Sequence, residues 1–157
     1  MNVKEYIQSW AESYKKDLTE NIMPFWMEHG WDRVNGGVYT CVNRDGSLMD
    51  TTKSVWFQGR FAFICAFAYN NIEKNQEWLD AAKSTLEFIE KHCFDEQGHM
   101  YFSVTAEGQP LRKRRYVFSE TFAAIAMSEY ALATGDQHWA QRALQVFEDT
   151  QRFLATP

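Results

Sequence analysis

The sequence predicts an all-α fold in which helices alternate with short β-hairpins. Long segments carry apolar residues at helical spacing, and only three prolines occur in 157 residues. A series of hairpin, apolar helix and two-faced helix occurs twice along the chain. A helix that is apolar on nearly every side is buried, whereas a two-faced helix covers it from outside. This alternation predicts an α/α toroid, in which inner helices are ringed by outer ones.

The first element expected is a helix over residues 3–28. Pro24 interrupts it, so a kink or a restart is expected there. Its apolar residues follow one another mostly at steps of three and four and form one stripe, made of Tyr6, Trp10, Tyr14, Leu18, Ile22, Phe25 and Trp26.

A β-hairpin and two helices are expected next. Residues 35–37 (Asn-Gly-Gly) are typical of a turn, residues 38–42 favour a strand, and residues 44–47 form the hairpin turn. Residues 53–72 then predict an inner helix, and residues 76–93 predict an outer helix. The inner side of that outer helix is expected to carry Trp78, Ala81, Ala82, Leu86 and Ile89.

The second unit repeats the first at an offset of 62 residues, which pairs Tyr39 with Tyr101 and Gly46 with Gly108. An opening helix and two units, at about 35–93 and 97–154, predict a single domain over residues 1–157. Two units are too few to close a toroid, so the domain is expected to be incomplete, as the N-terminal portion of a larger barrel.

Composition argues against several classes of protein. The net charge of −5 disfavours a nucleic-acid surface or an anionic membrane surface, and the basic run at 112–115 is interpreted as a solvated hairpin exit. The sequence contains no run of 18 apolar residues, so a membrane span is not expected. The widely spaced Cys41, Cys65 and Cys93 indicate reduced thiols in a cytoplasmic protein. The four histidines lack the spacing of metal ligands, so no metal site is expected.

Arg60 is the leading candidate for a functional residue. It follows Trp56 by four residues in the apolar helix, so the two side chains share a face. One interpretation is a buried arginine that pairs with Glu120 or Glu129 and holds the inner helices together. The favoured interpretation is a cation that lines the central cavity beside Trp56, because a buried charge is costly without a partner or a task.

Four further residues are candidate substrate-binding residues: Tyr39, Gln58, Phe118 and Glu120. At the repeat offset Gln58 falls opposite Glu120, and an aromatic residue precedes each of them by two positions. Tyr39 and its equivalent Tyr101 either overhang the mouth of the cavity or staple their own hairpins to the helices. The residues alone leave both roles open.

Two blocks of sequence closely resemble the N-acylglucosamine 2-epimerase family, also known as renin-binding proteins: "PFWMEHGWDRVNGGVYTCVNRDGSLMDTTKSVWFQGR" and "YVFSETFAAIAMSEYALATGD". The resemblance covers essentially the whole chain, and it implies an (α/α)6 barrel that interconverts N-acetyl-D-glucosamine and N-acetyl-D-mannosamine. It implies no required redox cofactor, with ATP as an activator of some members. It also places Arg60 in the active site, where Trp56 would pack against the sugar. The family's acid/base histidines belong to its C-terminal half, and none of the four histidines here matches them.

The leading interpretation is therefore a sugar 2-epimerase, an isomerase, represented by an N-terminal part that is inactive alone. Cellobiose and mannose epimerases and aldose–ketose isomerases are the alternatives within the same barrel. A non-catalytic protein-binding helical module and a glycoside hydrolase or lyase are alternatives from other classes. A small-molecule N-acetylhexosamine is the expected partner, with neither nucleic acid nor membrane. Apolar inner helices at an open edge also predict that the chain pairs through that edge with the missing part of the barrel or with another copy, so a homo-oligomer is expected.

Overall fold

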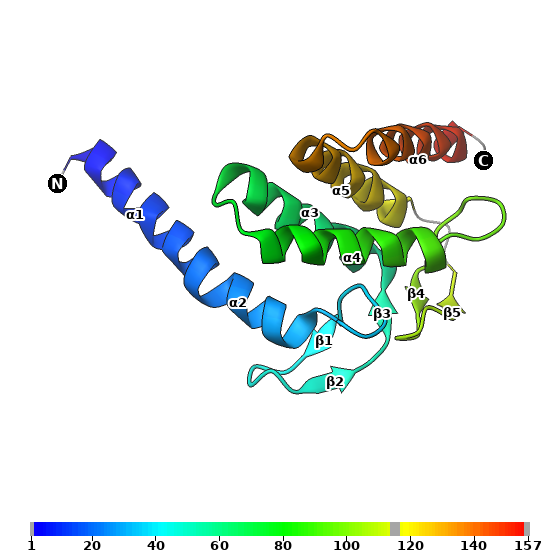
Figure 1. The fold of residues 1–157 in the computed structure, drawn as a ribbon, viewed down its shortest axis with the longest axis horizontal. Coiled ribbons are helices and arrows are strands. Elements are labelled where there is room, and N and C mark those ends of the chain that lie inside the picture. Colours follow the sequence, from blue (N-terminus) through cyan, green and yellow to red (C-terminus); the bar gives the residue numbers. More distant parts are fainter. Residues whose placement is uncertain (1, 114–116, 156–157) are drawn as a thin grey trace.

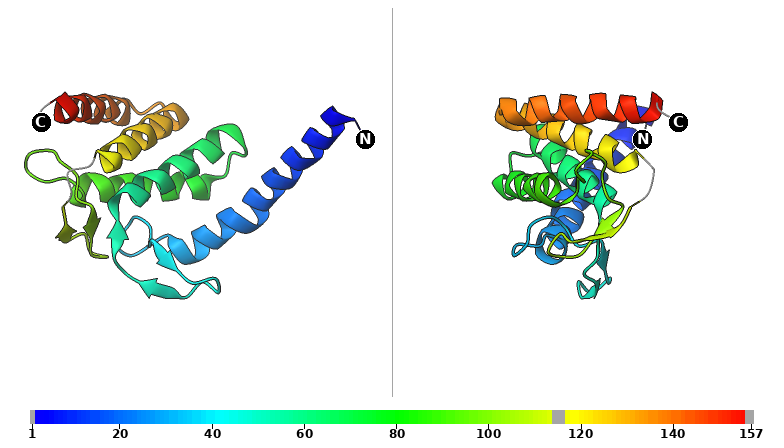
Figure 2. Two further views of the ribbon diagram at one scale, coloured as in Figure 1. Left: turned by 180° about the vertical axis from the view of Figure 1, so that it is seen from behind. Right: turned by 90° about the vertical axis from the view of Figure 1, so that its right-hand side faces the viewer.

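The computed structural model describes residues 2–113 and 117–155. Two pairs of long helices pack side by side above small β-hairpins, while the first helix projects away from them (Figures 1 and 2). The inner and outer helices of each pair are joined by short loops, as the alternation in sequence predicts. The pairs are α3 (Val55–Asn71) with α4 (Gln76–His92), and α5 (Phe118–Thr134) with α6 (Gln137–Ala155).

The opening helix contains two wide π-helical turns. Asn2 and Glu5 cap its start reciprocally, each side chain accepting the other's backbone N–H at 2.9 Å. Pro24 has no N–H to donate, and the wide turns lie on both sides of the short helix that contains it. The segments are α1 (Val3–Asp17), η1 (Leu18–Ile22), α2 (Met23–Phe25) and η2 (Trp26–Gly30).

The apolar stripe of the opening helix lies on the surface along α1, which buries none of its residues. Tyr6, Trp10 and Tyr14 instead pack on one another, with ring centroids 6.2 Å and 5.6 Å apart. Figure 2 shows why: α1 leaves the body of the molecule and has no neighbouring helix along most of its length.

The two hairpins have the same register at the predicted offset of 62 residues. Cys41 pairs with Asp50 in the first hairpin, and Ser103 pairs with Arg112 in the second, with a bulge at the equivalent place in each. The second hairpin also pairs with the strand that leads into α3, so neighbouring units share one sheet. The strands are β1 (Cys41–Val42), β2 (Leu48–Asp50), β3 (Lys53–Ser54), β4 (Ser103–Val104) and β5 (Pro110–Arg112).

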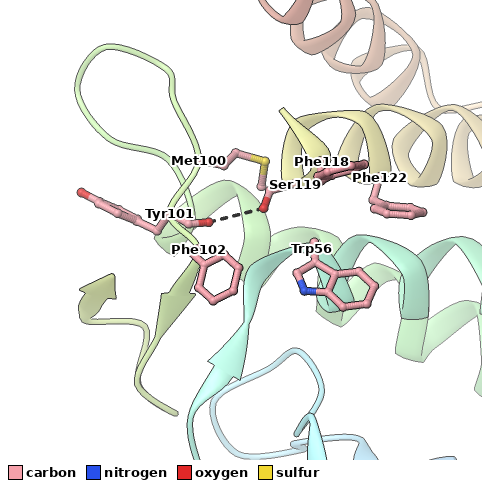
Figure 3. Close-up of a pocket in the computed structure, with 7 residues that line it drawn as sticks. All are labelled: Trp56, Met100, Tyr101, Phe102, Phe118, Ser119 and Phe122. Atoms are coloured by element: carbon pink, nitrogen blue, oxygen red, sulfur yellow. Dashed lines mark hydrogen bonds between the residues drawn. The ribbon is translucent and has the colours of Figure 1, made fainter. Parts of the chain in front are cut away.

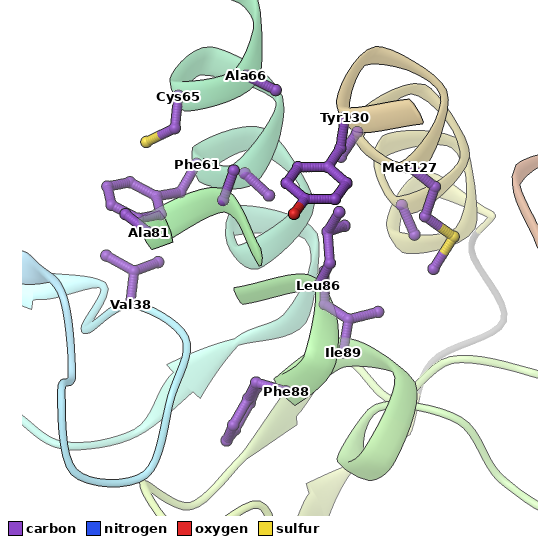
Figure 4. Close-up of a cluster of buried hydrophobic side chains, with 14 of the residues drawn as sticks. Val38, Phe61, Cys65, Ala66, Ala81, Leu86, Phe88, Ile89, Met127 and Tyr130 are labelled. Atoms are coloured by element: carbon purple, nitrogen blue, oxygen red, sulfur yellow. The ribbon is translucent and has the colours of Figure 1, made fainter. Parts of the chain in front are cut away.

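The core lies between the inner helices and α4 (Figure 4). Gly59 lets the inner helices approach closely, because a Cβ there would lie 2.7 Å from the backbone carbon of Phe122 and 2.9 Å from the nitrogen of Ala123. The predicted inner side of α4 is confirmed, since all five of its residues are buried: Trp78, Ala81, Ala82, Leu86 and Ile89.

Lys53 corrects one prediction. It was expected in the inner helix over 53–72, but α3 begins at Val55 and Lys53 lies in β3, completely buried. Its Nζ donates to Asp32 Oδ2 at 2.7 Å, to the Gly36 carbonyl at 2.7 Å and to the Ala106 carbonyl at 2.8 Å. Three acceptors for three N–H donors satisfy an ammonium group fully.

Asp32 is the matching half of this buried ion pair. Its Oδ1 accepts the backbone N–H groups of Val34 and Asn35, both at 3.0 Å, and its Oδ2 also accepts the Asn35 side chain. Burial alone would raise the pKa of Asp32, but the hydrogen bonds from Lys53 and Asn35 outweigh it and lower the pKa to about 2. The carboxylate is therefore ionised at neutral pH.

The structure describes only the first two residues of the basic run at 112–115. Arg112 is exposed in β5, and Lys113 forms an ion pair with Asp95, whereas residues 114 and 115 lie outside the described residues. No helix within the described ranges is both long and apolar enough to cross a membrane.

Replacing Lys53 by Met should lower the free energy of unfolding by about 3–5 kcal/mol, because the substitution leaves Asp32 buried without its cation. Denaturant titration at neutral pH measures this loss. Lys83→Met is the matched control: its exposed pair with Glu87, at 3.8 Å, should contribute less than about 1 kcal/mol. Equal losses in the two variants would contradict the role assigned to Lys53.

Replacing Gly59 by Ala should also destabilise the chain, by about 1–3 kcal/mol, although alanine is the better helix former. The added Cβ would meet backbone atoms of Phe122 and Ala123, which cannot turn aside as a side chain can. Ala140→Gly, at an exposed position of α6, gives the size of the helix-propensity effect alone. A Gly59→Ala variant more stable than the unaltered chain would disprove the close approach.

Candidate functional site

A cavity of about 310 Å³ lies between the second hairpin and the first turns of both inner helices (Figure 3). Its walls are mainly aromatic, so a ligand would meet ring faces rather than a dense set of hydrogen-bonding groups. Three stretches of the chain build it, at the start of α3, the start of α5, and the segment that leads into β4. The lining residues are Trp56, Met100, Tyr101, Phe102, Phe118, Ser119 and Phe122.

Arg60 lies at the edge of this cavity and is not among the residues that line it. Its guanidinium carbon is 5.5 Å from the Trp56 ring centroid and 5.6 Å from that of Phe122, and both rings line the cavity. The side chain is exposed, and none of the ion pairs among the described residues includes it. The interpretation of Arg60 as a buried cation paired with Glu120 or Glu129 is therefore wrong. A planar, permanently charged donor group remains available to a ligand.

Trp56 and Phe118 line the cavity together, as their equivalence in the repeat suggests. The two hairpin tyrosines differ. Tyr101 lines the cavity, whereas Tyr39 is half-buried with its ring centroid 5.2 Å from Lys53 Nζ. Burial and the nearby Asp32 carboxylate raise the pKa of Tyr39 to about 12. Tyr39 thus packs beside the buried ion pair and away from this cavity.

Neither Gln58 nor Glu120 lines the cavity. Gln58 is fully buried; its Oε1 accepts the Val38 N–H at 2.7 Å and its Nε2 donates to the Val38 carbonyl at 2.8 Å. Glu120 is also buried, and its Oε1 accepts the Met100 N–H at 2.8 Å. Both therefore hold a hairpin onto the start of an inner helix, and their predicted contact with substrate stays untested.

Sequence reasoning missed part of the lining: Met100, Phe102, Ser119 and Phe122. Phe122 follows Phe118 by one helical turn, a spacing that would have placed both on one face. Phe102 carried no such signal. It reaches Trp56 because its carbonyl accepts the Val55 N–H at 3.0 Å, a contact between residues 47 positions apart in the sequence.

None of the four histidines lines the cavity. Two of them have equivalent packing roles: a Cβ on Gly46 would lie 2.5 Å from the His29 ring, and a Cβ on Gly108 would lie 2.2 Å from the His92 ring. The described residues contain no group of three His, Cys, Asp or Glu side chains that could hold a metal ion.

Comparison with known proteins identifies relatives that align with most of the chain. The family model for N-acylglucosamine 2-epimerase (GlcNAc 2-epimerase) matches residues 37–156. The chain is 34% identical over 149 residues to N-acylglucosamine 2-epimerase of Rattus norvegicus, in an alignment that covers 92% of this chain and 35% of the relative. It is 32% identical over 140 residues to cellobiose 2-epimerase of Ruminococcus albus, covering 88% and 36%.

The fold also matches solved structures. The structure of cellobiose 2-epimerase from Bacillus thermoamylovorans superposes with a TM-score of 0.81 at 26% identity, covering 90% of this chain and 36% of that one. The predicted fold class, a portion of an (α/α)6 barrel with short hairpins, is thereby confirmed. The division into one domain with units at 35–93 and 97–154 stays a prediction. The chain spans about 35% of the length of the N-acylglucosamine 2-epimerases it matches.

Proposed function

The chain belongs to the N-acylglucosamine 2-epimerase family, and from this we propose that its protein interconverts N-acyl-D-glucosamine and N-acyl-D-mannosamine by inversion at C2. The observation that carries the proposal is Arg60, exposed at the edge of an aromatic cavity. A sugar has apolar C–H faces and polar edges, so aromatic walls beside one forked donor suit it.

The chemistry explains why a fixed cation belongs there. In the open-chain sugar the C2 proton is acidic because C1 is an aldehyde, and its removal leaves an enediolate with negative charge on O1. A proton returned to the opposite face gives the epimer. We propose that the Arg60 guanidinium donates to O1 and stabilises this charge, while Trp56 packs against the sugar.

We propose that the acid/base pair lies outside these 157 residues. The chain spans about 35% of the length of its relatives, and none of its four histidines lines the cavity. On this proposal the chain alone provides part of the sugar site and no turnover. Proton removal and return cause no net oxidation, so no redox cofactor is required; activation by ATP is a separate proposal, testable by adding the nucleotide.

A cellobiose 2-epimerase is the second candidate, favoured by relatives such as that of Ruminococcus albus. The same C2 chemistry applies, and the difference lies in the substituents that the site must accommodate. A cytoplasmic location is also a proposal, supported by three unpaired thiols, of which Cys65 and Cys93 are buried in the core.

N-acetyl-D-mannosamine incubated in heavy water with a full-length family protein that carries this segment should gain deuterium at C2 in both epimers. A chimera of the rat enzyme, with these residues in place of its matching 35%, provides such a protein. Arg60→Ala should lower kcat/KM by about 100-fold or more. Arg44→Ala, at an exposed position in the first hairpin turn, is the matched control and should leave kcat/KM unchanged.

Four results would count against what is proposed. Product without deuterium would rule out proton exchange with solvent at C2, and unchanged turnover in Arg60→Ala would remove Arg60 from the mechanism. Exchange in cellobiose but not in N-acetyl-D-mannosamine would select the second candidate. Turnover by the 157-residue chain alone would show that the acid/base pair lies within it.

We also propose that the 157-residue chain associates with a second copy through the outer edge of α5 and α6. Both helices expose large apolar side chains, which favour contact with another surface. They are Ile125 and Leu132 on α5, and Leu144 and Phe147 on α6.

Sedimentation should therefore show a dimer or higher oligomer, and Phe147→Asp should weaken self-association about tenfold or more, because a charge would be buried in the interface. Gln141→Asp is a matched control, since it adds the same charge at another exposed position of α6. A monomer across the micromolar range would refute the proposal.

A further inference from the structure

Gln58 and Glu120 occupy the same place in successive units. Each lies in the first turn of an inner helix, and each is buried. Each accepts a backbone N–H from the residue 20 positions earlier, at 2.7 Å from Val38 and at 2.8 Å from Met100. The repeat thus forms the same contact twice, called the latch below: a side chain in the first turn of an inner helix binds the backbone of the residue 20 positions earlier. The side chain is an amide in one unit and a carboxyl group in the other.

The two latches differ in their second polar atom. Nε2 of Gln58 donates to the Val38 carbonyl at 2.8 Å and to the Ser54 carbonyl at 3.2 Å. Oε2 of Glu120 is buried and has no hydrogen-bond partner among the described residues. An ionised carboxylate has no proton to donate, so it could not form the second hydrogen bond of the latch. Its charge would also be buried away from water.

No ion pair among the described residues neutralises Glu120. The titratable groups that act on it, His99 and Asp95, oppose each other: His99 favours the ionised form and Asp95 disfavours it. Asp95 is already paired with Lys113, and His99 stacks on Phe153 of α6 with ring centroids 3.7 Å apart. Burial is the largest effect, and it raises the pKa of Glu120.

We propose that Glu120 is held as a neutral carboxylic acid whose O–H donates to the carbonyl oxygen of Met100, as Nε2 of Gln58 donates to that of Val38. The proton completes the latch and leaves no buried charge. Met100 and Tyr101 form one wall of the cavity, and Ser119 precedes Glu120 directly. Glu120 is thus a positioning residue: its proton holds the hairpin wall against α5. This inference is independent of the sugar that the protein binds.

A protonated Glu120 makes the chain less stable as the pH rises. In the unfolded chain Glu120 ionises near its ordinary pKa of 4.5, whereas in the folded chain it keeps its proton to a higher pH. The stability due to the protonated latch is full below pH 4.5 and is lost as the pH rises through the folded pKa. Over that interval the unfolding equilibrium constant should rise about tenfold per pH unit from this group.

Glu120→Gln tests the proposal, because glutamine supplies the missing donor without a proton. Denaturant titrations from pH 5 to pH 9 should show the rise in the unfolding constant for the unaltered chain and its loss in Glu120→Gln. Gln58→Glu should introduce a second rise of the same sign. Glu148→Gln, at an exposed position of α6, is the matched control and should leave the pH dependence unchanged.

NMR distinguishes the effect of the Glu120 proton from a general loss of stability. The carboxyl carbon of Glu120, followed by NMR with pH, should titrate above 4.5, and the Met100 methyl resonance should shift with the same midpoint in the unaltered chain but not in Glu120→Gln. A Glu120 carboxyl that titrates at or below 4.5 would overturn the proposal. So would a Glu120→Gln variant that keeps the full pH dependence, or a Gln58→Glu variant that gains none.

Discussion

The buried ion pair between Lys53 and Asp32 fixes the arrangement on which the candidate site depends. Lys53 donates to the loop before the first hairpin, through Asp32 and Gly36, and to the second hairpin, through Ala106. Its backbone lies in β3, two residues before α3 begins. One ammonium group therefore sets how both hairpins meet the start of the inner helix. Because Trp56 follows within that first turn, its place in the cavity depends on this contact.

The helices and their repeat could be predicted from sequence because periodicity and turn residues are local signals. The inner side of α4 and the shared strip of Trp56 and Arg60 both follow from helical spacing. The burial of Lys53 could not be predicted in this way. Its three acceptors come from residues 17, 21 and 53 positions away, and only the folded chain brings them together. Pattern alone placed Lys53 in the helix.

Gln58 and Glu120 show a second limit of the sequence. Their equivalence was visible from the repeat, but the sequence did not show which way they point. A polar side chain in the first turn of an apolar helix suggests a ligand, yet here the hairpin backbone satisfies the amide of Gln58. The cavity is lined instead by aromatic residues from segments far apart in the chain. Its lining could be predicted in part for helical residues and not for Phe102.

The strand β3 belongs to the first unit in sequence, but it pairs with β4 of the second. Neighbouring units are thus joined by main-chain hydrogen bonds, which any residue except proline can donate. Apart from Lys53, whose side chain contacts both hairpin regions, the side chains at this junction can change while its main-chain hydrogen bonds are kept. Divergence can then reshape the rings and polar groups at the start of each inner helix without loss of the array. The residues around the cavity can thus differ between related proteins while the strand pairing that joins the units is kept.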